Sequence, residues 1–171
     1  MLISKELEAA INAQVGNEFG ASLQYVSIAS YFDREDLPEL TAFFFRQAEE
    51  ENEHAMKFVD YINETGGALK IAAIPATRHD FDSAEDAVKA ALDWEIEVTD
   101  QINQMMHIAV EQRDYIGQDF LRWFVSEQRE EISTMSTLLS VVRRAGENNL
   151  LLVEQFVART GHPEDAEGGE E

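Results

Sequence analysis

The sequence predicts an all-α protein: a four-helix bundle with a long crossover between the second and third helices and a short fifth helix. Four long segments repeat apolar residues with the period of an amphipathic helix. Only 3 prolines and 9 glycines occur among the 171 residues, which favours long helices over a β fold with many turns. Hydrophobic residues make up 44% of the chain, enough for one sizeable core.

The first two helices are predicted over residues 4–32 and 38–65. The second helix follows Asp36-Leu37-Pro38, because proline suits the first turn of a helix and aspartate suits its N-cap. Two glycines then end this helix. The connection over residues 66–82 is long enough to cross the length of the bundle. We therefore expect the second and third helices to run parallel, and each short link to join an antiparallel pair.

The third helix is predicted to begin after Ser83, a residue type that caps helix N-termini. Glu85 and Asp86 follow in its first turn, where the helix dipole favours negative charge. We expect this helix to end near residues 113–114 and a break around Gly117 to introduce the fourth helix.

The fourth helix is predicted to end at Arg143-Arg144 and Gly146, since cations and then glycine are typical of a helix C-terminus. A short fifth helix is expected over residues 149–159. The bundle and this helix form one domain over residues 1–161. The acidic segment 162–171 is expected to be a disordered tail.

Charge favours cations as partners. The chain has 34 acidic and 13 basic residues and a net charge of −21, so we expect binding neither to nucleic acid nor to a membrane. The absence of cysteine excludes disulfides and thiolate metal sites. The N-terminal residues do not resemble a secretory signal, and the expected location is the cytoplasm. The alternative is that the acidic surface serves only solubility.

The regularly spaced apolar residues of each long helix form a stripe along one face of that helix. Near the middle of each helix, this stripe contains polar residues. In the third helix, the stripe from Ala84 to Ala109 is apolar at every position except Glu95. Stripes of this kind face the interior of a bundle. The polar members of the four stripes are, in chain order, Gln14, Glu18 and Ser22; Gln47, Glu51 and His54; Glu95; and Gln128 and Glu131.

Four carboxylates near four helix midpoints are predicted to meet at one level of the bundle interior. Burying a carboxylate is costly unless it is paired or bound to metal, and the stripes hold no Lys or Arg near this level. Two divalent cations would neutralise the four charges. Oxygen ligands with one imidazole suit iron or manganese. Since Glu95 interrupts an otherwise apolar stripe, we also expect Glu95→Leu to stabilise the metal-free bundle.

Each residue has a simpler structural interpretation. A single glutamate in a stripe can be a rim residue, and the Glu51-x-x-His54 pattern occurs by chance. Tyr25 lies two turns from Glu18 on the same face, either as a core tyrosine or as a hydrogen-bonding or redox neighbour of the metals. For Gln128 we favour a hydrogen bond to Glu131 over direct ligation.

A second acidic group adjoins the first: Glu50 neighbours Glu51, and Glu127 lies one turn before Glu130 and Glu131. Like charges at this spacing destabilise a helix unless a cation lies between them. The group is either a third metal position or a solvated acidic face.

These motifs resemble those of bacterial-type, haem-free ferritins. The resemblance rests on Asn17-Glu18-Phe19 with Tyr25, on residues 49–54, on Glu95 and on residues 123–131, and it covers about residues 2–159. Ferritin-like bundles are the known example of carboxylate-rich di-metal centres. The family implies a cage of 24 subunits that oxidises Fe(II) with dioxygen or peroxide and stores a ferric mineral.

The resemblance also implies a role for each matching residue. Glu18, Glu51 and His54 would hold the first iron, and Glu51 would bridge to a second iron completed by Glu95 and Glu131, with Gln128 nearby. A third iron position would involve Glu50, Glu127 and Glu130. The fifth helix would line four-fold channels, and Asp119 would face a three-fold entry channel.

Two departures distinguish the chain from haem-binding bacterioferritins. Those proteins repeat E-x-x-H on the fourth helix, where this chain has Gln128-Arg129-Glu130-Glu131. They also carry a haem-ligating methionine at the position of Asn52. We therefore expect no haem. The alternatives are a bacterioferritin-like protein or a helical bundle that binds without catalysis.

Overall fold

A computed structural model describes residues 2–160 of the chain. This part is all-α, as predicted, and none of its helices is long and apolar enough to cross a membrane. The predicted domain end at residue 161 and the acidic tail lie outside the described residues. The elements are α1 (Lys5–Arg34), α2 (Pro38–Glu64), α3 (Ala84–Glu111), α4 (Tyr115–Ala145), the 3-10 turn η1 (Glu147–Asn149) and α5 (Leu150–Thr160).

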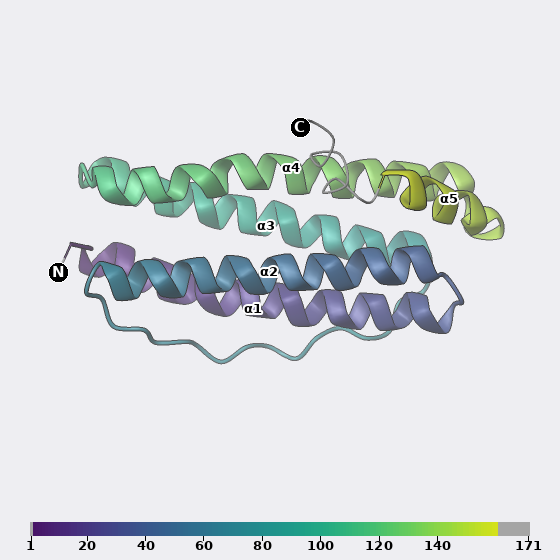
Figure 1. Cartoon of the computed structure of the whole chain (residues 1–171), viewed down its shortest axis with the longest axis horizontal. Coiled ribbons are helices and arrows are strands. Elements are labelled where there is room, and N and C mark those ends of the chain that lie inside the picture. Colours follow the sequence, from purple (N-terminus) through teal and green to yellow (C-terminus); the bar gives the residue numbers. More distant parts are fainter. Residues whose placement is uncertain (1, 161–171) are drawn as a thin grey trace, which may run out of the picture.

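The topology is that of two antiparallel hairpins, α1 with α2 and α3 with α4, joined by a long crossover (Figure 1). The crossover runs the length of the bundle beside α1, so α2 and α3 are parallel as the sequence predicts. The short α5 lies at the end of the bundle where α2 and α3 begin.

The predicted stripes form the core. The stripe positions named above are buried, except for the partly exposed Ser22. The buried apolar side chains divide into two clusters, one around Phe44 and Met135 and the other around Phe58 and Phe124. The stripe glutamates and His54 lie between these clusters in the sequence of every helix.

The predicted N-cap of α2 is wrong. Asp36 adopts a left-handed conformation with φ 56°, and Leu37 occupies the cap position without a side-chain hydrogen bond. The carboxylate of Glu154 on α5 replaces the cap, because it accepts hydrogen bonds from the backbone N–H groups of Glu39 (2.8 Å) and Leu40 (2.9 Å). A cap supplied by a distant segment has no local sequence signal.

The predicted break at Gly117 is also wrong, because Gly117 lies inside α4. The turn is made by Arg113 with φ 55°, and Asp114 caps α4 by accepting a hydrogen bond from the Gly117 N–H at 2.9 Å. Glycine suits the packing here, since an added Cβ would lie 2.8 Å from Leu7 Cδ2 on α1 and the Leu7 side chain would have to shift. The Ser83 cap of α3 is confirmed: its hydroxyl accepts a hydrogen bond from the Asp86 N–H at 3.0 Å.

Candidate metal centre

Five acidic and imidazole side chains from all four long helices are buried in the polar middle of the bundle. None of them is more than 5% exposed, as the stripes predict. Ligand atoms of Glu18 on α1 and of Glu51 and His54 on α2 lie within 4.8 Å of one another, close enough to share one ion. The five residues are Glu18, Glu51, His54, Glu95 and Glu131.

Glu95 from α3 is held by hydrogen-bond donors on two other helices. The Tyr25 hydroxyl on α1 donates to Glu95 Oε1, and Gln128 Nε2 on α4 donates to Glu95 Oε2 at 3.0 Å. The same amide lies 3.3 Å from the Thr99 hydroxyl. The predicted hydrogen bond from Gln128 to Glu131 is therefore wrong: the amide reaches across to α3 instead.

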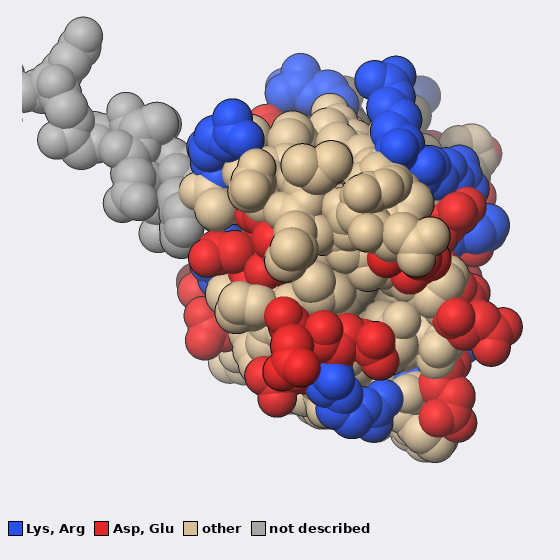
Figure 2. Space-filling view, turned by 90° about the vertical axis from the view of Figure 1, so that its right-hand side faces the viewer, with Lys and Arg blue, Asp and Glu red and all other residues tan. Residues whose placement is uncertain are grey.

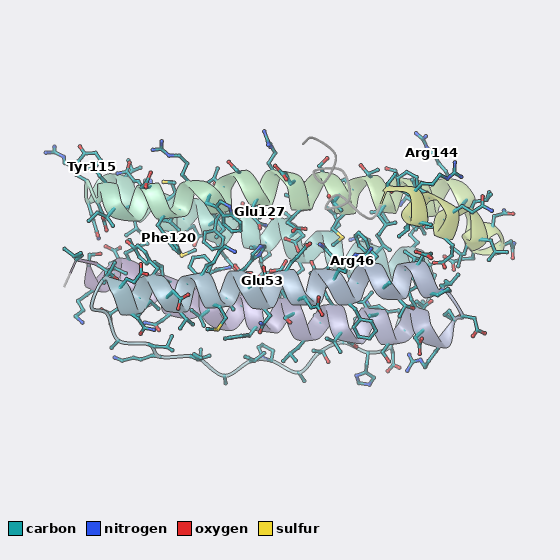
Figure 3. The ribbon with its side chains drawn as sticks, in the orientation of Figure 1. Arg46, Glu53, Tyr115, Phe120, Glu127 and Arg144 are labelled. Atoms are coloured by element: carbon teal, nitrogen blue, oxygen red, sulfur yellow. The ribbon has the colours of Figure 1, made fainter. Side chains whose placement is uncertain are left out.

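His54 is fixed by two carboxylates and two aromatic rings. Its Nδ1 lies 3.2 Å from Glu51 Oε2, and its Nε2 lies 3.9 Å from Glu127 Oε1. The rings of Trp123 and Phe124 approach it edge to face, with centroids at 5.4 and 5.9 Å. Figure 3 labels Glu127 on α4 and shows it at the level of the centre, facing α2.

The acidic pKa values show how costly this burial is. Burial raises the pKa of Glu18 well above its ordinary value, and repulsion from Glu51 raises it further. Burial, and then repulsion from Glu95, likewise raise the pKa of Glu51. Burial also raises the pKa of Glu95, although its two hydrogen bonds oppose the shift. Burial and then Glu95 raise the pKa of Glu131 from 4.5 to about 9.

The metal-free protein is therefore expected to lose stability as pH rises. Between pH 4.5 and 9 the folded state retains a proton on Glu131 that the unfolded state has released. The free energy of unfolding should fall through this window by about 1.4 kcal/mol per pH unit for each such proton. Denaturant unfolding of the metal-free protein at pH 5.5 and 8.5 measures the effect. In Glu131→Gln the dependence should be weaker, and an unchanged dependence would contradict this explanation.

The second acidic group is only partly assembled. Glu50 and Glu127 both raise the pKa of Glu131, so these two carboxylates lie close to the centre. The Gln47 amide donates a hydrogen bond to Glu50. Glu130 does not join them, because its side chain is exposed and pairs with Arg129 at 3.2 Å.

The sequence alone did not indicate that Gln14, Trp123 and Thr99 contact the side chains of the centre. Gln14 Nε2 donates a hydrogen bond to Glu18 Oε1 at 2.8 Å, and Gln14 precedes Glu18 by one turn in the same stripe, which is a usable signal. Trp123 covers His54 and carries the Lys57 ammonium 4.5 Å above its ring. Neither Trp123 nor Thr99 belongs to a stripe, so the apolar pattern could not identify them.

The donor set fits iron. Four carboxylates and one imidazole supply hard and intermediate ligands, which suit Fe(II). Glu18 Oε2 is buried and receives no hydrogen bond from an amide or hydroxyl group among the described residues; a hydrogen bond between the Glu18 and Glu51 carboxyl groups requires a proton on one of them. A buried carboxylate oxygen left unpaired is costly in the metal-free protein, and a bound cation would satisfy it.

Comparison with known proteins gives consistent matches. The Ferritin-like domain matches residues 8–145. Ferritin BfrB from Mycobacterium tuberculosis is 42% identical over 154 residues, which cover 90% of this chain and 84% of that protein. A bacterial non-heme ferritin from Staphylococcus aureus is 36% identical over 162 residues, which cover 93% and 98%.

A solved structure agrees with these relatives. The open-pore ferritin of the hyperthermophilic archaeon Archaeoglobus fulgidus superposes with a TM-score of 0.88 at 31% identity, covering 91% of this chain and 98% of that one. The domain match spans most of the chain, and the relatives align with nearly all of it. The chain therefore belongs to the ferritin family of iron-storage proteins.

Proposed function

We propose that this ferritin binds two Fe(II) ions among its buried carboxylates, oxidises them to Fe(III) and passes the product to a stored ferric mineral. The observation that carries the proposal is the burial of four carboxylates and one imidazole between two apolar clusters. Two Fe(II) ions bring a charge of +4 against the −4 of the ionised carboxylates. Compensation of this kind removes the cost of burying like charges together.

The ligand assignment follows from which side chains are neighbours. Glu18, Glu51 and His54 form the first position. Glu51 bridges to the second position, which Glu95 and Glu131 complete. Burial raises its pKa most, and the charges of Glu95 and Glu131 raise it further, which supports a place for Glu51 between the two positions.

The chemistry transfers two electrons for each pair of iron ions. Two Fe(II) ions lose one electron each, and dioxygen with two protons becomes hydrogen peroxide; alternatively, hydrogen peroxide with two protons becomes two waters. The carboxyl protons leave when Fe(II) binds, because only the ionised form is a ligand. Tyr25 keeps its proton, since burial raises its pKa well above the ordinary value, and it continues to position Glu95.

A third cation position is proposed beside Glu50 and Glu127. Both carboxylates already act on Glu131, whereas Glu130 could contribute only by leaving Arg129. We expect this position to receive iron after the first two, since its side chains are more exposed than the central ones. Asn52 stands at the haem-ligand position of the bacterioferritins, and we propose that the protein works without haem.

Glu130→Ala and Glu131→Ala should therefore differ. The Glu131 variant should slow the first oxidation, because a buried ligand is lost. In the Glu130 variant the first oxidation should keep its rate, and only the stoichiometry or later turnover should change. Stopped-flow absorbance of Fe(III) after one and after several additions of Fe(II) separates the two. An equal early defect in both variants would refute the division into central and third positions.

A cage of 24 copies is the assembly we propose. Figure 2 looks onto the end of the bundle near α5, where a patch of uncharged side chains is surrounded by Lys, Arg, Asp and Glu. Leu151 and Leu152 on α5 are 72% and 57% exposed, which supports contact with other copies around four-fold channels. Asp119 is exposed in the first turns of α4, which supports a place at a three-fold entry channel.

The competing function is a bundle that binds partners without catalysis. Adding Fe(II) salt to the metal-free protein in air and following Fe(III) absorbance distinguishes them. A ferroxidase gives a fast phase equivalent to about two iron ions per chain, well above the rate in buffer. A rate equal to that of buffer would refute the proposed function.

A further inference from the structure

A chain of hydrogen-bonded side chains leads from the surface of α3 to the candidate centre. Gln101 Nε2 lies 3.4 Å from Glu97 Oε1, and Asn17 Nδ2 lies 3.0 Å from Gln101 Oε1. Asn17 Nδ2 also lies 3.4 Å from Gln14 Oε1, and Gln14 Nε2 donates to Glu18 Oε1 at 2.8 Å. The chain therefore connects an exposed carboxylate on α3 with a buried carboxylate on α1.

The carboxylates at the two ends of this hydrogen-bonded chain determine which side of each amide group donates and which side accepts. Ionised Glu97 and metal-bound Glu18 can only accept hydrogen bonds. A chain with an acceptor at each end needs one member that donates on both sides. The Asn17 amide does this, since its NH2 group faces the carbonyl oxygens of both Gln14 and Gln101. Asn17 thereby turns the NH2 group of Gln14 toward Glu18.

The orientation of Gln14 places the two carboxylate oxygens of Glu18 in different environments. Oε1 accepts a hydrogen bond from Gln14, whereas Oε2 is buried and receives none from an amide or hydroxyl group among the described residues. In the metal-free protein the Glu18 and Glu51 carboxyl groups share a hydrogen bond through a proton that leaves when a cation binds. A carboxylate restrained in this way has one oxygen free for a cation. Without the restraint it could rotate and bind with both oxygens, or turn away from the site.

We propose that Gln14 and Asn17 are positioning residues that hold Glu18 as a one-oxygen ligand of the first iron position. The inference rests on the proposed function, because it concerns the same centre. Gln101 anchors the chain on α3, so the restraint also ties α1 to the opposite hairpin at the level of the metals. Neither Gln14 nor Asn17 touches the iron; both act through Glu18.

In the other half of the centre a carboxylate is also held by hydrogen-bond donors, although there both of its oxygens accept one. There Gln128 Nε2 donates to one oxygen of Glu95 at 3.0 Å, and the Tyr25 hydroxyl donates to the other. A glutamine amide therefore restrains one carboxylate at each proposed iron position. Neighbours of this kind set ligand orientation, and their loss lowers metal affinity by roughly 10- to 100-fold.

The test compares Gln14→Leu and Asn17→Asp with the wild type, using Zn(II) as a cation that is not oxidised. Calorimetry should show binding at the first position weakened by roughly 10-fold or more in Gln14→Leu. Infrared difference spectra of the Zn(II)-loaded and metal-free proteins should change as well. The gap between the antisymmetric and symmetric carboxylate stretches is wide for one-oxygen ligation and should narrow in the variant.

Asn17→Asp distinguishes the effect of lost hydrogen bonding to Gln14 from the effect of an added negative charge on Zn(II) binding. The substitution has nearly the same shape but adds a negative charge, so electrostatic attraction alone would tighten Zn(II) binding. An ionised aspartate cannot donate to Gln14. Our inference therefore expects weaker binding and the same infrared change. Tighter or unchanged binding in a folded Asn17→Asp protein would overturn it. This partly exposed site also provides a test if Gln14→Leu fails to fold.

Gln104→Leu is the matched control, because Gln104 is an exposed amide on the same helix as Gln101. It should bind Zn(II) like the wild type. Failure of the proposed function would appear in the wild type itself, as a lack of Fe(II) oxidation. A wild type that oxidises Fe(II), together with variants that match it in affinity and infrared spectrum, would overturn only the role of Gln14 and Asn17.

Discussion

Replacing Glu51 with alanine is expected to abolish the fast phase of Fe(II) oxidation while leaving the helices and the assembly intact. Glu51 lies beside Glu18 and His54, and it is close enough to Glu95 and Glu131 for their charges to raise its pKa, which burial already raises. Both proposed iron positions therefore depend on it. The packing of α2 comes from the apolar members of its stripe, which the substitution leaves in place. Stopped-flow absorbance of Fe(III) measures the rate, and circular dichroism with size-exclusion chromatography checks the fold and assembly.

His54→Ala should show the same loss, because it removes the only imidazole of the first position. The matched control is Glu53→Ala, which removes an exposed carboxylate from the same helix, labelled in Figure 3. This control should keep the wild-type rate. Unchanged initial rates in both Glu51→Ala and His54→Ala would contradict the assignment of the site.

Replacing Glu131 with leucine is expected to stabilise the metal-free protein at pH 8. The pKa of Glu131 is raised to about 9, and no hydrogen bond to its carboxyl group is present among the described residues. Removing a buried group that lacks partners, and filling the space with an apolar side chain, should raise the free energy of unfolding by about 1–4 kcal/mol. Leucine cannot bind iron, so the variant should also lose fast oxidation and much of its stabilisation by added cation.

Glu95→Leu should not give the same gain, although the sequence alone favoured it. The substitution leaves the Tyr25 hydroxyl and the Gln128 amide without their acceptor. Each buried donor left unpaired costs about 1–3 kcal/mol, which offsets the benefit of removing the charge. Denaturant unfolding of the metal-free proteins compares the two variants, with assembly checked separately because dissociation complicates a single midpoint. A destabilised but assembled Glu131→Leu protein would contradict the view that Glu131 is a strained ligand.

The helices and the crossover were predictable because burial follows the helical period. Each stripe could be predicted from the spacing of residues within its own helix. The same spacing identified Glu95 as a buried carboxylate. The two errors involve contacts between segments far apart in the sequence. Glu154 caps α2 from the fifth helix, and Gly117 lies inside α4, where a larger residue would crowd Leu7 on α1.

The sequence predicted which residues form the candidate centre, but not which hydrogen-bond partners each of them has. The sequence identified the level at which Glu18 and Glu131 lie, because each lies near the middle of its helix. It could not identify that Gln128 reaches Glu95, since this depends on the rotation of α4 against α3. For the same reason it could not distinguish the near carboxylate Glu127 from the exposed Glu130, only three residues away.

The central claim is that two iron ions bind inside a single chain, between all four long helices. Crystals soaked in Fe(II) salt without oxygen, with diffraction data recorded at the iron absorption edge, test it most directly. We expect two anomalous peaks at the level of Glu51, one beside Glu18 and His54 and the other beside Glu95 and Glu131. Anomalous peaks confined to surface carboxylates, with none at this level, would contradict the account.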